Sequence, residues 1–218
     1  MGIFSRKGTD TAVVETFDAP TVAVQDISGD YTIDTSHSRL GFSARHAMVT
    51  TVRGAFKEFE GTAHIDTANP AASSVSLTIK TASIDTGVAD RDGHLASPDF
   101  FDVENFPEMT FRATGVEGDG EDYTLTGDLT IRGITKPVEL EVEFTGVAVD
   151  PFGATRAGFS AETEISRKEF GLTWNAALET GGFLVSDKVK INLEAALVKQ
   201  DQGHQEPGQQ DATETAAP

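Results

Sequence analysis

Residues 137–144 read Pro-Val-Glu-Leu-Glu-Val-Glu-Phe, with hydrophobic side chains on the even positions from Val138 to Phe144 and glutamates on the odd positions between them. Successive side chains of a β-strand point to opposite faces, so this period of two predicts a strand with one buried and one charged face. The hydrophobic face must pack against an interior, and the glutamates must meet water.

The same alternation recurs along most of the chain, in residues 31–33, 59–65, 75–79, 109–113, 123–131, 157–165 and 189–197. Glu117-Gly118-Asp119-Gly120 and Asp150-Pro151-Phe152-Gly153 have the composition of short antiparallel turns. About eight strands joined by hairpins, with one helical interruption, predict an all-β fold, an eight-stranded antiparallel β-barrel with a short helix insertion. A two-sheet sandwich is the structural alternative.

The helical interruption lies between residues 86 and 107. Ser97 is placed to cap a helix, Pro98 to occupy its first position and Asp99 to supply an acid in its first turn, while Pro107 prevents a long continuation. These signals predict a short helix that carries Phe100 and Phe101. Together with Phe106, these rings could close one end of the barrel or contact its contents.

Length and composition predict one domain, residues 27–199, between a disordered N-terminal tail, 1–26, and a disordered acidic C-terminal tail, 200–218. The 218 residues include no cysteine, which excludes disulfides and thiolate metal sites. A formal charge of −18 disfavours nucleic acid and the anionic face of a membrane. We find no run of signal-peptide length and no integral membrane segment, and expect an acidic, cytoplasmic protein.

Small residues interrupt the hydrophobic faces where a solid core would require bulk. An eight-stranded barrel is either filled by its side chains or holds one small ligand, so inner residue size decides between the two. Small residues at positions on the hydrophobic face of a strand predict a cavity, although glycines in strands also permit bends and bulges. These small residues are Gly61, Ala63, Ala113, Gly127, Gly146, Ala148, Ala157 and Ala161. The order Phe144, Gly146, Ala148 predicts that this strand tapers from bulky to small.

Phenylalanine supplies 14 of the aromatic residues, against two tyrosines and one tryptophan. Because phenylalanine has no polar group, a pocket lined by it suits a hydrocarbon better than a sugar or nucleotide. The alternative is that these are ordinary core residues. The apolar candidates for ligand binding are Phe42, Phe59, Phe100, Phe101, Phe106, Phe111, Phe144, Phe159, Phe170, Leu172 and Trp174.

Two polar groups are weaker candidates for ligand contacts. Asp92 could orient His94 and neutralise Arg91, and we favour a clasp that fixes the helix on the barrel rim over a role in ligand binding. Residues 35–57 contain basic side chains and no acid, so His37, His46 and Arg53 could hold an anionic head group; outward pairing is the preferred alternative. Motifs for hydrolysis, nucleotide binding and metal ligation are absent from the sequence, so we expect no catalytic residue, metal or cofactor.

Several segments carry a resemblance to a known family. They are Tyr31-Thr32-Ile33-Asp34 with His37-Ser38, the run Arg91-Asp92-Gly93-His94-Leu95-Ala96-Ser97-Pro98-Asp99-Phe100-Phe101-Asp102, the run from Gly127 to Val138, and Arg167-Lys168-Glu169-Phe170-Gly171. Over about residues 29–198 the chain resembles the YceI-like family. The resemblance implies an extended, lipocalin-like barrel that binds an isoprenoid lipid, a polyprenyl chain or isoprenoid quinone, without catalytic activity.

The leading hypothesis is therefore a polyisoprenoid-binding protein that transports, stores or sequesters its lipid. The alternative is a non-enzymatic interaction or stress-related module with a filled barrel. A homodimer is expected if the Phe100-Phe101 surface or a sheet edge is exposed, because large apolar patches seldom stay bare.

Overall fold

The structure is a computed structural model that describes residues 26–179 and 181–200. The predicted tails therefore lie outside the described residues, apart from Asp26 and Gln200 at their inner ends. Within the described part the chain forms eleven strands, one α-helix and three 3-10 helices.

The strands and helices follow one another along the chain as follows: β1 Gly29–Ile33, β2 Arg39–His46, β3 Thr50–Phe56, β4 Phe59–Ile65, η1 Pro70–Ala72, β5 Ser74–Lys80, η2 Thr81–Ser83, β6 Ile84–Asp85, α1 Ala89–Ala96, β7 Glu108–Asp119, β8 Asp122–Ile131, β9 Ile134–Val149, β10 Thr155–Ser166, η3 Arg167–Phe170 and β11 Val185–Lys199.

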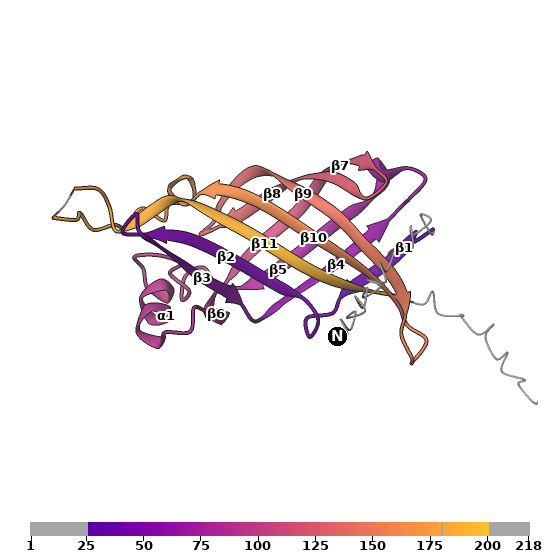
Figure 1. Ribbon diagram of the computed structural model, residues 1–218, viewed down its shortest axis with the longest axis horizontal. Coiled ribbons are helices and arrows are strands. Elements are labelled where there is room, and N and C mark those ends of the chain that lie inside the picture. Colours follow the sequence, from indigo (N-terminus) through magenta and orange to yellow (C-terminus); the bar gives the residue numbers. More distant parts are fainter. Residues whose placement is uncertain (1–25, 180, 201–218) are drawn as a thin grey trace, which may run out of the picture.

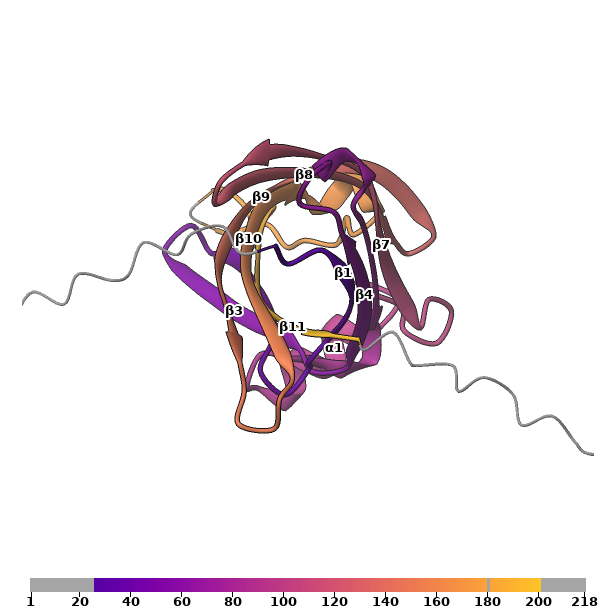
Figure 2. The same ribbon diagram turned by 90° about the vertical axis from the view of Figure 1, so that its right-hand side faces the viewer.

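Eight of the described strands close into an antiparallel barrel in the order β1-β4-β5-β7-β8-β9-β10-β11. The seam is the pairing of β1 with β11, from Tyr31 opposite Lys199 to Ile33 opposite Leu197. Seen end-on, the strands form a ring (Figure 2). The predicted barrel is confirmed, and closure excludes the two-sheet sandwich.

The sheet also extends past this seam. The first part of β11 pairs with β2 rather than β1, and β2 continues into β3 and the short β6. At the left-hand end in Figure 1 the sheet is thus wider than the barrel, and α1 lies beside β6 there.

Strand β9 confirms the alternation of residues 137–144, because Phe144 is buried and the glutamates between the hydrophobic residues are exposed. The predicted taper beyond Phe144 is wrong. Phe144 pairs with Phe159, whereas Gly146 pairs with Gly158, so Thr145 is an extra residue that forms a β-bulge. The bulge exchanges the inward and outward faces for the rest of the strand, so Ala148 is exposed.

The interrupting helix exists, but its predicted position is wrong. Ser97 ends α1 instead of starting it, in an extended conformation before Pro98, with its Oγ donating to the His94 carbonyl at 2.7 Å. A residue before proline is biased away from helical geometry, which explains this boundary. Phe100 and Phe101 therefore lie in the turns after α1.

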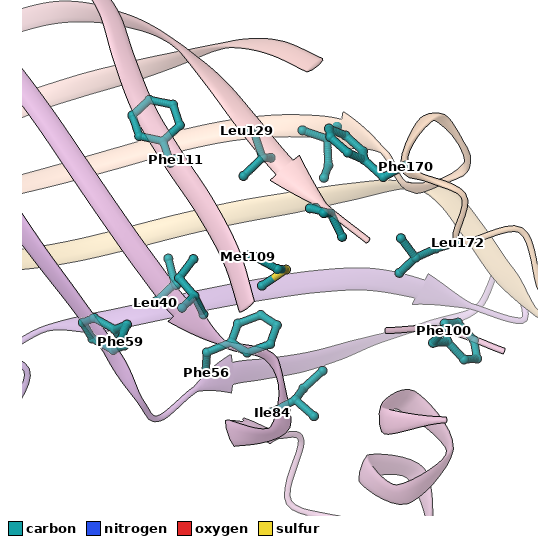
Figure 3. Close-up of a cluster of buried hydrophobic side chains, with 13 residues drawn as sticks. Leu40, Phe56, Phe59, Ile84, Phe100, Met109, Phe111, Leu129, Phe170 and Leu172 are labelled. Atoms are coloured by element: carbon teal, nitrogen blue, oxygen red, sulfur yellow. The ribbon is translucent and has the colours of Figure 1, made fainter. Parts of the chain in front are cut away.

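Tightly packed hydrophobic residues fill the end of the barrel nearest α1 (Figure 3). Met109 and Leu129 are buried there with Phe100 above the helix and with Phe170 and Leu172 after β10. A smaller cluster with Tyr31 as its largest side chain lies around the β1 seam. The two clusters leave the barrel between them less completely filled.

Candidate ligand-binding cavity

A cavity of about 270 Å³ runs through the barrel interior. Its walls come from the inward faces of all eight barrel strands and from β2 and β3. The hydrophobic lining includes Ile33, Phe42, Phe56, Ala63, Leu77, Ile79, Phe101, Met109, Phe111, Val116, Leu125, Leu129, Val138, Leu140, Val142, Phe144, Phe159, Ala161, Ile165, Val189, Ile191, Leu193, Ala195 and Leu197. Such a wall suits an apolar ligand.

Polar lining residues concentrate at one end, around the connection from β4 through η1 to β5. Asp66, Thr67 and Ser73 lie there, where the Asp66 amide donates to the Ser73 hydroxyl at 2.9 Å. Among the described residues, no lysine or arginine lines the cavity. The one other basic residue of the described lining is His64, which pairs with Asp30 at 2.7 Å, so a bound anion would find no lysine or arginine there.

Thr163 is a polar group within the apolar part of the wall. It lies on β10 opposite Ile191 and between Ala161 and Ile165 on the inward face. Its hydroxyl makes no hydrogen bond to any other described residue, so it is available to a ligand. A hydroxyl in an apolar wall gains from a partner, because an unmatched polar group in such surroundings costs about 1–3 kcal/mol.

The small residues that predicted the cavity have four different outcomes. Gly61, Ala63 and Ala161 line it, as predicted. At Gly127 the Phe111 ring fills the space that a side chain would occupy, since an added Cβ would lie 2.4 Å from that ring. Ala113 and Ala157 pack into the hydrophobic clusters instead. Gly146 and Ala148 follow the bulge and do not share the Phe144 face.

Of the aromatic candidates, five line the cavity: Phe42, Phe101, Phe111, Phe144 and Phe159. Phe59 is buried in the cluster near α1 without reaching the lining. The Phe106 ring lies against the Arg132 guanidinium, 5.8 Å from its centre. Phe100 is only 6% exposed and Phe101 packs edge-on against Phe56, so this pair does not form an exposed surface, which removes one of the two grounds for the predicted homodimer and leaves the sheet edge as the other.

Phe100, Phe170, Leu172 and Trp174 form a plug at the end of the barrel near α1. The His94 ring packs edge-on against Phe100 and Trp174, with ring centres 5.1 and 4.6 Å apart. The buried Arg167 guanidinium holds the following loop by donating to the carbonyls of Leu172 and Trp174. Burial lowers the pKa of Arg167 from its usual value.

The Arg91, Asp92 and His94 group does clasp the helix, but through partners other than those predicted. Asp92 accepts hydrogen bonds from the amide and hydroxyl of Thr86, and Arg91 donates to the hydroxyl and carbonyl of the same residue. His94 pairs with Asp99 at 3.0 Å. Asp92 therefore orients Thr86 rather than His94, and neither Arg91 nor His94 lines the cavity.

The basic candidates also lie outside the cavity. His37 is exposed and pairs with Asp34 at 2.8 Å, and His46 is exposed at the end of β2. Arg53 is exposed on β3 opposite Ser43, on the outward face. The structure does not bring these three side chains together at the ligand cavity.

Val116 and Thr163 line the cavity but are not among the residues expected from the sequence. Thr163 shares the alternation of Ala161 and Ile165, whereas the expected apolar residues are all aromatic apart from Leu172. Val116 follows a second bulge, where Ala113 pairs with Gly127 but Gly115 pairs with Thr126. The bulge exchanges the inward and outward faces of β7, and no residue in the sequence signals this exchange.

A sequence profile described as the YceI-like domain matches residues 31–197. The chain belongs to the YceI-like family. Protein YceI of Escherichia coli O17:K52:H18 is 45% identical to this YceI-like chain over 148 residues, 67% of the chain and 78% of the relative. No helix in the described part is long and apolar enough to span a membrane.

Solved structures agree with this assignment. BcnA of Burkholderia cenocepacia has a TM-score of 0.66 and 27% identity, covering 75% of this chain and 98% of BcnA. A Campylobacter jejuni YceI protein has a TM-score of 0.62 and 32% identity, with 72% and 90% coverage. A domain from Saccharophagus degradans described as polyisoprenoid binding shares the fold, with a TM-score of 0.60 and 18% identity over 78% of this chain and 98% of that domain.

Proposed function

We propose that this YceI-like protein binds an isoprenoid lipid, a polyprenyl chain or isoprenoid quinone, inside its barrel and so transports, stores or sequesters it. The observation that carries the proposal is the nearly continuous hydrophobic wall of the cavity. A hydrocarbon loses little by entering such a wall, whereas a sugar or nucleotide would leave polar groups unpaired. The fold shared with a domain described as polyisoprenoid binding supports the same ligand class.

We further propose that the head group is uncharged, as in a quinone or a polyprenyl alcohol. No described lysine or arginine lines the cavity, and Asp66 lies among the polar residues at the η1 end. A phosphate there would meet the Asp66 carboxylate, and the one basic neighbour in the described lining, His64, is already paired with Asp30; burying a charge without a partner is costly. Thr163 can donate to a carbonyl or alcohol oxygen without any change of charge.

Competition binding with a cavity-filling variant tests this function. Ala195→Phe adds a ring at a position that lines the cavity, whereas Ala148→Phe adds the same ring on the exposed face of β9. We expect Ala195→Phe to weaken binding of a long-chain isoprenoid quinone at least tenfold and Ala148→Phe to leave it unchanged. Equal affinities in two folded variants would place the ligand outside the barrel and contradict the proposal.

A further inference from the structure

Three exposed hydrophobic side chains meet at the end of the molecule nearest α1. Met48 and Val49 form the turn between β2 and β3 and are 68% and 75% exposed, and Phe183, before β11, is 59% exposed. The Ala47 amide donates to the Leu184 carbonyl at 2.7 Å, which holds the turn and the loop side by side. Both segments project at the left of Figure 1. We call Met48, Val49 and Phe183 the tip patch.

The turn is built from residues that folding alone would not favour. Ala47 and Met48 have φ values of 48° and 62°, in the left-handed region. The Val49 amide donates to the His46 carbonyl at 3.0 Å, so Ala47 and Met48 are the central residues of a β-turn; positive φ at both favours Asn and Gly, and a methionine is strained there. Keeping a methionine here costs stability and exposes a flexible apolar side chain, which suggests a role in contact with a partner.

Two cations, Arg45 and Lys168, lie beside the tip patch. Arg45 donates to the Met48 and Val49 carbonyls and remains exposed, and Lys168 Nζ lies 5.7 Å from the centre of the Phe183 ring. Arg53, exposed on the adjoining strand, has no ion pair with a described residue. The loop also carries Glu179, and Asp187 caps η3 through Ser166 and the Lys168 amide. Apolar side chains flanked by cations suit the interface of an anionic bilayer.

A row of acids lies on the outer face of the barrel wall. Glu139, Glu141 and Glu143 are exposed on β9, and Glu162 of β10 lies opposite Glu141. At physiological salt, charges farther apart than about 8 Å are largely screened, so the charges that act on a surface touching the tip are the neighbouring ones: the cations Arg45 and Lys168 and the exposed acids Glu169 and Glu179.

A second exposed apolar turn lies at the other end of the barrel and provides a contrast. Val149 and Phe152 are 68% and 95% exposed, but the same end carries the exposed acids Asp119, Glu121 and Asp122. An anionic bilayer would be repelled there. Arg45 and Lys168 beside the tip patch therefore favour it over the Phe152 turn for contact with an anionic surface, even though the net charge of the chain is −18.

We propose that the tip patch docks the protein on the surface of an anionic lipid bilayer, with Met48, Val49 and Phe183 inserted among the acyl chains and Arg45, Arg53 and Lys168 at the phosphates. The proposal rests on the proposed function, because a bilayer is where a long isoprenoid lipid dissolves. It also places the plug formed by Phe100 and Trp174 at the docked end of the barrel.

Co-sedimentation of the full chain with phosphatidylcholine–phosphatidylglycerol vesicles tests the docking. The variant Ala47→Asn/Met48→Gly/Phe183→Ser gives the turn its preferred sequence, so it should fold at least as well while losing two apolar contacts. We expect its vesicle affinity to fall at least tenfold. Arg53→Glu should weaken binding about fivefold or more, and only to the anionic vesicles.

Phe152→Ser is the matched control, because it removes an exposed ring from the opposite end; its vesicle binding should equal that of the wild type. Wild-type chains that stay in the supernatant, or a triple variant that binds as well as the wild type, would overturn the proposal. A concentration-dependent dimer abolished by the triple variant, without vesicle binding, would assign the patch to a second copy instead. Lipid content measured on the same proteins reports separately on the cavity.

Discussion

At the scale of single residues, the space inside the barrel is decided by how neighbouring side chains share it. Gly127 and Gly54 both look like gaps in the sequence, yet the Phe111 ring covers the first and the Phe42 ring covers the second. Gly61 and Ala161, with similar sequence contexts, do line the cavity. Residue size thus predicted a hollow barrel correctly, but could not say which small residues leave space empty.

Gly127→Ala should destabilise the protein. The new Cβ would lie 2.4 Å from the Phe111 ring and 2.6 Å from the Arg112 carbonyl oxygen, and the backbone oxygen cannot move aside easily. Overpacking of this kind costs about 1–3 kcal/mol, which thermal unfolding should report as a lower Tm. Gly93→Ala is the control: in α1 nothing lies within 4 Å of its Cβ, and a helical alanine should leave the Tm equal or higher. Equal Tm values for Gly127→Ala and the wild type would contradict the packing described.

Thr163→Val should separate recognition of the lipid's isoprenoid chain from recognition of its head group. The variant keeps the shape of the side chain and removes the hydroxyl that faces the cavity. We expect the affinity for an isoprenoid quinone or alcohol to fall about fivefold, the equivalent of one hydrogen bond, with no loss for a pure hydrocarbon in a displacement assay. Thr124→Val, on the exposed face of β8, is the control. Equal losses for both ligand types would argue against a polar contact at Thr163.

At the scale of strands and helices, the sequence predicted which segments are strands but not where they bend. Residues 137–144 alternate without interruption, and β9 follows that pattern until Thr145 adds one residue and reverses the faces. The helix between residues 86 and 107 was predicted one segment too late, because Ser97-Pro98 reads equally well as a start signal and as a stop. Pairing with β10, a contact between strands, fixes the bulge, whereas α1 is held locally by Thr86, which bonds to Arg91 and Asp92 five and six residues further along the chain.

The turn between β1 and β2 is held to β10 by Asp34, which predicts acid sensitivity. Hydrogen bonds from Ser36, Arg156 and His37 hold the pKa of Asp34 well below its usual range. A carboxylate with a depressed pKa in the folded state contributes stability above its ordinary pKa, and that contribution is lost as the pH falls below about 4. Asp34→Asn should therefore lower the Tm near pH 7, and the difference from the wild type should shrink toward pH 2.

Thermal unfolding monitored by circular dichroism across this pH range is the measurement. Glu139→Gln, which removes an exposed carboxylate without an ion pair to any described residue, serves as the control and should show a small difference at neutral pH. A Tm difference for Asp34→Asn that stays constant down to pH 2 would mean that the Asp34 contacts do not contribute to stability.

At the scale of the whole molecule, the barrel has two unlike ends joined by an apolar interior. The end near α1 is closed by Phe100, Trp174 and their neighbours, and the other end carries the polar residues around η1. The sequence predicted the class of fold and the apolar nature of the site because both follow from alternation and composition. It predicted that Phe100 could close one end of the barrel, but not that Trp174 would join it, since the two rings come from loops separated by about seventy residues whose meeting depends on barrel closure.

The central claim is that the barrel holds an uncharged isoprenoid lipid. Native mass spectrometry of the full chain purified from cells, followed by organic extraction and mass analysis of the extract, tests it most directly. We predict a bound species whose added mass matches an isoprenoid quinone or polyprenyl alcohol, and which is reduced in Ala195→Phe but not in Ala148→Phe. Bare polypeptide that also fails to take up added quinone or polyprenyl alcohol would contradict the account.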